Sequence, residues 1–303
     1  MLVEATASTM VIFDNELSPG NIRALEEIIG VTVLDRSALI MDIFAQRAKT
    51  KEGRLQVELA QYQYLLPRLS GMGRSLSRQG GGIGTRGPGE TKLESDRRHI
   101  RERIARLEGE LQQVRQVRGV QRERRMKNSV PVVAIVGYTN AGKSTLLNRL
   151  TGAGIPANNR LFDTLDTTSR QLKVSDNLDV ILSDTVGFIA KLPHHLVDAF
   201  RATLEELQYA DLLLHVIDSA DPNRQEHIEV VDKLIASLAK PGTPVIYCYN
   251  KADLVSREEL PVGENVIAVS AAKGNGMEAL LKLIETTLGH ARHQVKLCLP
   301  YSM

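Results

Sequence analysis

The stretch that decides the fold is VVAIVGYTNAGKS, residues 132–144 of the 303-residue chain. It begins with five apolar residues, the length of a buried strand, and Gly137 to Ser144 then match the pattern G-x-x-x-x-G-K-[ST]. A helical pattern follows directly over Ser144–Leu150. A glycine-rich turn between a strand and a helix surrounds a phosphate with backbone N–H groups, and the helix N-terminus adds partial positive charge. The stretch therefore predicts a loop that binds phosphate.

The rest of the second half alternates between strand and helix patterns. Apolar strand runs are expected at Val132–Val136, Val180–Leu182, Leu212–Ile217, Val245–Tyr249 and Val266–Val269, with helical patterns between most of them and after the last, ending near Leu288. Such alternation predicts an α/β fold with a mainly parallel sheet covered on both faces. Residues 129–290 are therefore expected to form one domain around the phosphate-binding loop.

Charged and hydroxyl groups suited to a triphosphate follow in the expected places. The Lys143 ammonium would contact the β- and γ-phosphate oxygens, and the Ser144 hydroxyl would bind Mg²⁺. Asp184-Thr-Val-Gly187 closes a strand and fits D-x-x-G, in which the carboxylate holds Mg²⁺ through water and the glycine N–H senses the γ-phosphate. We therefore expect Lys143 and Gly187 to act in catalysis, and Ser144 and Asp184 to hold the metal.

The base is predicted from a later motif, Asn250-Lys251-Ala252-Asp253, which fits N-K-x-D. The Asp253 carboxylate can accept hydrogen bonds from guanine N1–H and from the N2 amino group, a pair that adenine lacks. Asn250 would tie this loop to the phosphate-binding loop, and backbone N–H groups of Ser270–Gly274 would reach guanine O6. All four motifs follow strand ends, where open α/β sheets bind their ligands. The sequence thus predicts a protein that binds and hydrolyses GTP.

The first half, residues 1–128, has a different pattern. Its expected elements are a strand at Val11–Phe13, a helix that begins at Ser18-Pro19, a strand at Val31–Leu34, a helical stretch over Ser37–Leu66, a glycine-rich loop over residues 70–92 and a helix over Ser95–Arg125. They predict a small α/β domain with a long antiparallel helical hairpin, which carries the glycine-rich loop at its tip.

The motifs together resemble the HflX family of the translation-factor-related GTPases. The resemblance covers nearly the whole chain and rests on Gly137–Ser144, Leu161–Asp166 (LFDTLD), Asp184–Phe188 (DTVGF), the glycine loop Gly80–Glu90 (GGGIGTRGPGE) and Asp14–Pro19 (DNELSP). It implies binding to the large ribosomal subunit, with a role in splitting or rescuing stalled ribosomes. It also implies a small domain after the GTPase domain; residues 291–303 would be its start, and a truncated chain or a short family member stays open.

The resemblance completes the expected site. It implies that Thr164 is the switch threonine, a catalytic group whose hydroxyl reaches Mg²⁺, with Thr167 and Thr168 as nearby alternatives. The expected contacts to GTP or GDP are Gly137, Tyr138, Thr139, Asn140, Ala141, Gly142, Lys143, Ser144, Thr145, Phe162, Asp163, Thr164, Leu165, Asp166, Asp184, Thr185, Val186, Gly187, Asn250, Lys251, Asp253, Ser270, Ala271 and Ala272. A secondary use of ATP, reported for the family, stays open.

Two positions bear on the rate of hydrolysis. Many regulatory GTPases carry a glutamine directly after D-x-x-G to orient the attacking water, and here that position is Phe188. Because an apolar side chain cannot hold water, we expect slow intrinsic hydrolysis that the ribosome stimulates. Asn140 resembles an asparagine that coordinates K⁺ in related GTPases, but an asparagine that merely stabilises the loop is the alternative.

Net charge is +2 for the whole chain but is unevenly distributed. Residues 68–127 hold 16 Lys and Arg against 7 Asp and Glu. The candidate RNA contacts are Arg97, Arg98, Arg101, Arg103, Arg106, Arg115, Arg118, Arg122, Arg124, Arg125 and Lys127. We expect this hairpin to bind ribosomal RNA mainly through phosphates, against the alternative of a solvated helix face. A GTPase that assists tRNA or RNA modification and a regulator at a membrane surface are the competing functions.

Several classes of protein are disfavoured by composition. No run approaches the ~18 apolar residues that a membrane-spanning helix needs, and the start does not resemble a signal peptide. Two cysteines, Cys248 and Cys298, are too few for a disulfide framework, and Cys248 is expected in the core. His194 and His195 are expected to start a helix rather than to bind metal. A cytosolic monomer is the simplest expectation, and peripheral membrane association stays open.

Overall fold

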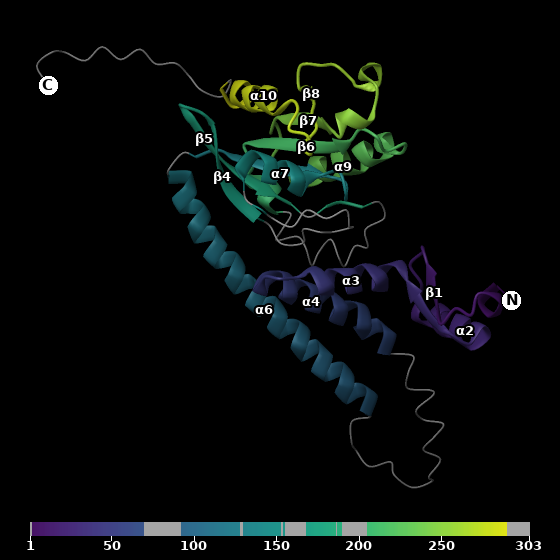
Figure 1. Ribbon diagram of the computed structural model, residues 1–303. Helices are drawn as coiled ribbons and strands as arrows, with labels where there is room; N and C mark the ends of the chain where they lie inside the picture. The colour runs from purple at the N-terminus through teal and green to yellow at the C-terminus, as the bar shows by residue number, and fades with distance from the viewer. Residues whose placement is uncertain are drawn as a thin grey trace, which may run out of the picture. The chain divides into compact units, whose positions relative to one another are not determined.

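The computed structural model describes residues 2–69, 92–127, 130–152, 154, 168–185, 187–189 and 205–289. The described residues fall into two compact units, the first ending at Arg124 and the second starting at Arg125 (Figure 1). The boundary expected between residues 128 and 129 lies outside the described residues, as do residues 291–303 and nearly all of the glycine-rich loop.

The first unit begins with a short helix, α1 (Leu2–Ala5), and a strand–helix–strand motif. Strands β1 (Met10–Phe13) and β2 (Thr32–Asp35) pair in parallel, and α2 (Pro19–Ile29) makes the crossover. The side chain of Ser18 accepts a hydrogen bond from the Asn21 N–H at the start of α2, which makes Ser18 an N-cap. The strand–helix–strand pattern expected from the sequence is confirmed.

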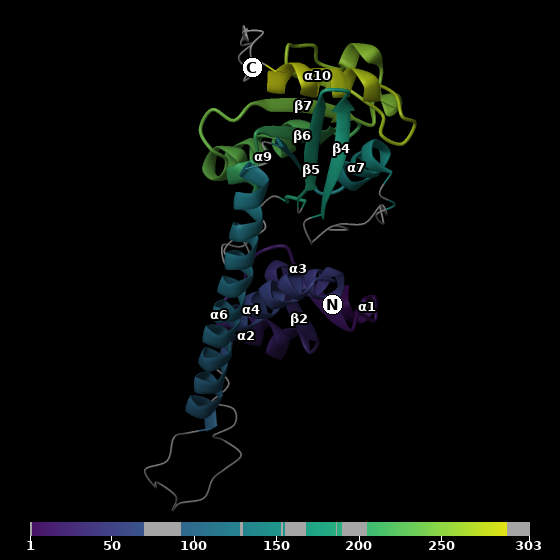
Figure 2. The ribbon, with the colours of Figure 1, turned by 90° about the vertical axis from the view of Figure 1, so that its left-hand side faces the viewer.

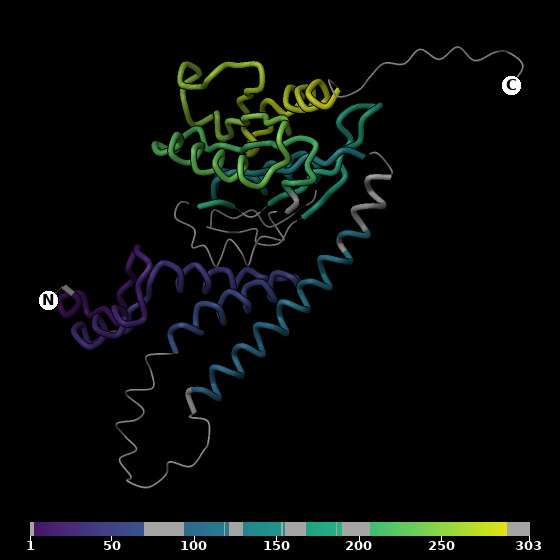
Figure 3. Tube along the Cα trace, turned by 180° about the vertical axis from the view of Figure 1, so that it is seen from behind, coloured from purple at the N-terminus to yellow at the C-terminus, as the bar shows by residue number. Residues whose placement is uncertain are grey.

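The helical stretch expected over residues 37–66 is wrong as a single helix. The chain forms α3 (Arg36–Arg47) and α4 (Lys51–Arg68), which Figure 3 shows side by side. The backbone leaves the helical region at Ala48 (φ −64°, ψ 106°), and the Thr50 hydroxyl then accepts from the Gly53 N–H at 3.0 Å. Thr50 is therefore the cap of a new helix, a signal that the apolar periodicity masked.

The predicted helical hairpin is confirmed by α4 and α6 (Lys92–Lys127), which run antiparallel (Figures 1 and 2). Leu55 and Leu59 pack against Leu107 and Leu111 in one apolar cluster. Arg103 of α6 donates to one carboxylate oxygen of Glu58 through Nε at 2.9 Å and Nη2 at 2.6 Å. Apolar burial and this ion pair together fix the register of the two helices.

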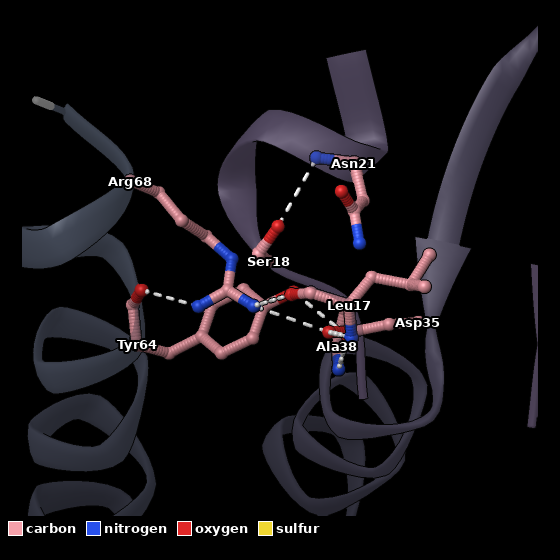
Figure 4. Close-up of polar contacts among 7 residues, drawn as sticks. All are labelled: Leu17, Ser18, Asn21, Asp35, Ala38, Tyr64 and Arg68. Atoms are coloured by element: carbon pink, nitrogen blue, oxygen red, sulfur yellow. Dashed lines mark hydrogen bonds and ion pairs between the residues drawn. The ribbon is translucent and has the colours of Figure 1, made fainter. Parts of the chain in front are cut away.

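A buried carboxylate connects three segments of the first unit (Figure 4). Asp35 is fully buried and caps α3 by accepting from the Ala38 N–H at 2.8 Å. It also accepts from the Tyr64 hydroxyl at 2.8 Å and from Arg68 Nη2 at 3.1 Å, and the Arg68 guanidinium lies 3.2 Å from the Tyr64 ring centroid. Arg68 Nη2 donates in addition to the Leu17 carbonyl at 3.0 Å. The end of α4 is thereby tied to the segments that precede α2 and α3.

The second unit is built on a six-stranded sheet in the order β4-β5-β3-β6-β7-β8. Its strands are β3 (Val132–Gly137), β4 (Thr168–Ser175), β5 (Leu178–Asp184), β6 (Leu212–Asp218), β7 (Val245–Asn250) and β8 (Val266–Ala268). All neighbours are parallel except β4 and β5, so the mainly parallel sheet is confirmed. Sequence reasoning missed β4, because an edge strand reading TSRQLKVS lacks an apolar run.

Helices cover both faces of this sheet. They are α7 (Lys143–Thr151), α9 (Arg224–Leu238) and α10 (Met277–Gly289), with the 3₁₀ segments η2 (Glu205–Tyr209), η3 (Ala252–Leu254) and η4 (Arg257–Glu259). Side chains of α7 and α10 join one core cluster with Leu212 and Leu214 of β6, whereas α9 packs on the opposite face. No helix in the described part of the chain is both long and apolar enough to cross a membrane.

Candidate nucleotide-binding site

The phosphate-binding loop, which joins β3 to α7, contains two residues in backbone conformations with positive φ. Asn140 and Gly142 both have positive φ, 64° and 93°. A Cβ atom on Gly142 would lie 2.2 Å from Nδ2 of Asn250, so no larger residue fits beside that amide. The loop ends where the backbone N–H groups at the start of α7 point outward, the arrangement that binds anions.

Lys143 is buried at the first position of α7. Its Nζ donates to the Tyr138 carbonyl at 2.9 Å. Burial lowers the pKa of Lys143 to about 8, and the nearby Asp184 carboxylate offsets part of that effect. A buried ammonium gains most from an anionic partner, so this site favours phosphate.

Ser144 and Asp184, the two described residues expected to hold Mg²⁺, lie in contact. The Ser144 hydroxyl donates to Asp184 Oδ2 at 3.0 Å, and Asp184 is fully buried at the end of β5. A hydroxyl and a carboxylate are oxygen ligands of the kind that Mg²⁺ prefers. Among the described residues, no cluster of three or more His, Cys, Asp or Glu is placed to hold a metal. Mg²⁺ is usually held by one or two carboxylates and takes phosphates and water as its other ligands.

The segment after D-x-x-G is attached to the phosphate-binding loop by its main chain. The Thr139 N–H donates to the Phe188 carbonyl at 2.8 Å, and the Phe188 N–H donates to the Gly137 carbonyl at 3.2 Å. A Cβ on Gly187 would lie 3.1 Å from Lys143 Nζ, so the Gly187 backbone approaches the lysine closely. The Phe188 side chain is apolar and buried, 3% exposed, so it has no polar group to orient an attacking water.

Asn250 bridges the two ends of the predicted site, as its motif indicates. Its Nδ2 donates to the Ala141 carbonyl at 2.9 Å, and its Oδ1 accepts from the Ala271 N–H at 3.0 Å. One buried amide therefore joins the phosphate-binding loop, the end of β7 and the loop after β8.

The Asp253 carboxylate is prepared to act as an acceptor. A hydrogen bond from Ser270, and after it one from Lys273, hold the pKa of Asp253 below its ordinary value. Lys273 Nζ lies 3.3 Å from Asp253 Oδ2. Asp253 therefore stays ionised at neutral pH, as acceptance of two guanine N–H groups requires.

The loop after β8 differs in detail from the sequence expectation. The Ala271 N–H is taken by Asn250, and the Ser270 N–H donates to the Asn275 carbonyl. The Lys273 and Gly274 N–H groups donate to Ser270, so within this loop, as far as the structure describes it, Ala272 is left as the candidate donor to guanine O6. The carbonyls of Ala271 and Ala272 accept from Arg149 of α7.

Two contacts of the site were missed by sequence reasoning. Asp218, at the carboxyl end of β6, pairs with Lys251 at 2.6 Å, and Arg149 holds the loop after β8. The position of Asp218 at a strand end was a usable signal; nothing in the sequence marks Arg149. Phe162, Asp163, Thr164, Leu165, Asp166 and Val186 lie outside the described residues, as do His194 and His195, and their roles stay predictions.

Part of the basic segment is used within the first unit. Arg68 is held in the Asp35 cluster, and Arg103 pairs with Glu58. Arg98 and Arg106 are exposed and face glutamates four residues further along the helix. Exposed arginines also include Arg101 and Arg115. The side chains of Arg118, Arg122, Arg124, Arg125 and Lys127 are outside the described set.

The arrangement described above is that of a P-loop GTPase. A mainly parallel sheet carries the G-x-x-x-x-G-K-S loop, the D-x-x-G aspartate Asp184 contacts Ser144 of that loop, and the N-K-x-D asparagine Asn250 is hydrogen-bonded to the loop main chain. Three family models match consecutive parts of the chain: "GTP-binding GTPase N-terminal" over residues 1–45, "GTP-binding GTPase Middle Region" over 47–125 and "50S ribosome-binding GTPase" over 132–251. The chain belongs to the HflX family of GTPases, as its motifs indicated.

Relatives match over nearly the whole chain. GTPase HflX of Caldanaerobacter subterraneus is 55% identical over 99% of this chain and 70% of its own length. GTPase HflX of Escherichia coli K12 is 46% identical over 97% of this chain and 71% of its own. Among solved structures, a GTP-binding protein of Sulfolobus solfataricus in complex with GDP is 26% identical, with a TM-score of 0.55 over 94% of this chain and 82% of its own. The chain is therefore a GTP-binding protein of a GTP-hydrolysing family.

Proposed function

We propose that this chain is a GTP-controlled factor that binds the large ribosomal subunit and acts in splitting or rescuing stalled ribosomes. The observation that carries the proposal is the combination of a GTPase unit, matched by a model described as a 50S ribosome-binding GTPase, with a long helix rich in exposed arginines. The guanidinium groups of Arg98, Arg101 and Arg106 suit phosphate, and they lie on one helix, along which an RNA backbone could run.

In this proposal the described site residues take the roles that their geometry supports. Lys143 leaves the Tyr138 carbonyl for the β- and γ-phosphates, and Asp253 with the Ala272 N–H selects guanine. Ser144 and Asp184 would hold Mg²⁺, which when bound supplies charge neutralisation between the phosphates. Gly187 senses the γ-phosphate through its N–H, beside Lys143.

Hydrolysis by the chain alone is proposed to be slow. The Phe188 side chain is buried and cannot orient water, and its main chain is already bonded to Thr139 and Gly137. The ribosome then supplies or orders the group that positions the nucleophile. Single-turnover hydrolysis measured with and without saturating large subunits tests this step; a rate that the subunits leave unchanged would contradict it.

Potassium dependence is a separate proposal at Asn140. The positive φ of Asn140 is a conformation that asparagine tolerates well, so the backbone alone gives a reason for this residue. Hydrolysis in KCl and in NaCl at equal ionic strength decides between the two roles: a rate that depends on the cation supports coordination, and equal rates support loop geometry.

The ribosome proposal is tested by co-sedimentation with purified subunits. We expect the chain to pellet with large subunits in a non-hydrolysable GTP analogue and less so in GDP. A variant with Arg98, Arg101 and Arg106 all changed to Glu should lose binding, and three lost phosphate contacts should lower the salt slope by about three. The matched control changes Lys173, Lys233 and Lys240, exposed on the GTPase unit, to Glu. Binding to tRNA alone or to anionic vesicles in place of subunits would favour the RNA-modification or membrane alternatives.

A further inference from the structure

Tyr138 of the phosphate-binding loop stacks on a histidine from another element. Its ring lies flat against the imidazole of His227, with centroids 3.6 Å apart and planes 8° from parallel. His227 is in the first turn of α9, which follows β6. Neither the GTPase motifs nor the mechanism above uses this histidine.

The main chain of Tyr138 carries contacts to the reacting end of the site. Its carbonyl accepts from Lys143 Nζ at 2.9 Å. Tyr138 and Phe188 also form an isolated parallel bridge, through the bonds of Thr139 and Gly137 described above. The lysine therefore contacts the loop at Tyr138, the residue that His227 stacks on, and the segment after D-x-x-G contacts it at the two residues on either side of Tyr138.

His227 is itself fixed from the other side. Its Nδ1 lies 3.3 Å from Asp221 Oδ2, and Asp221 Oδ1 accepts from the Asn223 N–H at 2.9 Å. Arg224 Nη1 donates to the Ser219 carbonyl at 2.9 Å across the same turn. This turn follows Asp218, the partner of Lys251. Because these contacts set the orientation of the imidazole without Tyr138, His227 offers the tyrosine ring a rigid surface to pack on.

We propose that His227 is a positioning residue for GTP hydrolysis: it holds Tyr138, and through the tyrosine main chain it holds Lys143 and the Gly187–Phe188 segment in the arrangement that the γ-phosphate needs. The proposal rests on the proposed roles of Lys143 and Gly187. If the loop is already ordered in the free protein, nucleotide binding does not have to include the loss of conformational entropy of the loop. Since Lys143 meets both phosphates whereas Gly187–Phe188 meets only the γ-phosphate, GTP depends on the stack more than GDP does.

The experiment compares variants of the full chain that separate the ring from its hydrogen bond. We expect His227→Ala to weaken a non-hydrolysable GTP analogue about tenfold and GDP about threefold, and to lower the single-turnover rate about tenfold, as loss of one aromatic stack predicts. His227→Phe, which keeps a flat ring, should restore each value to within about threefold of the parent. His227→Gln, which keeps a polar group without a ring, should behave as the alanine variant does. Glu226→Ala, an exposed neighbour on α9, is the control.

Two further measurements keep a folding defect apart from a positioning role. The double variant Tyr138→Ala with His227→Ala should be no worse than Tyr138→Ala alone, since both remove one contact. The urea midpoint of each variant reports folding. The proposal would be overturned if the affinities and single-turnover rates of His227→Ala lay within twofold of the parent's, or if His227→Phe were as impaired as His227→Ala. Binding and hydrolysis by the parent chain test the nucleotide function itself, and only the ratio of variant to parent tests His227.

Discussion

At the scale of single residues, Asn250 is the clearest case of a side chain that holds distant parts of the site together. Its amide donates to Ala141 and accepts from Ala271, and it fills the space that Gly142 leaves open. Because all these atoms are buried, neither hydrogen bond can be replaced by water when the amide is removed.

We therefore predict that Asn250→Ala lowers the free energy of unfolding of the nucleotide-free protein by about 2–4 kcal/mol, two buried hydrogen bonds at the usual cost of leaving a partner unsatisfied. Urea denaturation checks this value. Asn223→Ala is the matched control, because Asn223 is exposed and its side chain makes no capping bond. A loss below about 0.5 kcal/mol would mean that the amide bonds are not made in solution.

Asp253 is predicted to decide which purine binds. Asp253→Asn replaces an acceptor by a group that also donates, so GDP should bind about 100-fold more weakly, as the loss of charge-assisted hydrogen bonds implies. Xanthosine diphosphate, which has a carbonyl in place of the guanine amino group, should gain affinity. Fluorescence titration with both nucleotides measures the change. An unaltered preference for GDP would remove Asp253 from the base site.

The positions of the motifs at strand ends could be predicted because each motif is contiguous. The hydrogen bond from the Ala271 N–H to Asn250, which leaves Ala272 as the candidate donor to guanine O6, could not be predicted in that way, because it depends on where the Asn250 side chain reaches. The pairing of Tyr138 with His227 was equally hidden, since the packing of α9 alone brings together two rings 89 positions apart.

At the scale of elements, periodicity predicted most helices and strands but not their interruptions. The break between α3 and α4 depends on a Thr50 cap inside a stretch whose apolar spacing continues on both sides. β4 is polar because it is an edge strand, and its position depends on pairing with β5 rather than on its own sequence.

Asp35 provides the element-scale prediction. Asp35→Ala removes the cap of α3 and leaves the mostly buried Arg68 without its carboxylate, so unfolding of the first unit should become easier by about 3–5 kcal/mol. Hydrogen exchange of the α3 and α4 amides in the full chain localises the effect. Asp42→Ala, at an exposed position of α3, should change exchange by less than about 0.5 kcal/mol. Equal protection in the two variants would contradict the role assigned to Asp35.

At the scale of the whole molecule, net positive charge is concentrated in one part of the sequence. Residues 68–127 carry an excess of Lys and Arg over Asp and Glu, and the rest of the chain is acidic on balance. Sequence reasoning found this division from charge alone. It could not tell which arginines are used internally, as Arg68 and Arg103 are, because their partners lie elsewhere in the sequence, Asp35 at the end of β2 and Glu58 on α4.

Cys248 gives a probe of the second unit as a whole. It is fully buried in β7, and burial raises the pKa of its thiol to about 12 from an ordinary value of 9.0. At pH 8 its thiolate fraction is then about a thousandfold lower than that of a free cysteine. In a Cys298→Ser background, iodoacetamide should label Cys248 only when the unit unfolds, at a rate that falls when GDP is added. Rapid labelling of the native protein would show that the sheet core is open.

The most direct test of the central claim, a guanine-specific phosphate site, is competition for labelled GDP in the presence of Mg²⁺. We expect GTP to displace the label at a concentration near that of GDP itself, and ATP to require at least about 100-fold more, because adenine cannot satisfy the Asp253 carboxylate. Failure to take up labelled GDP, or displacement by ATP as effective as that by GTP, would contradict the account.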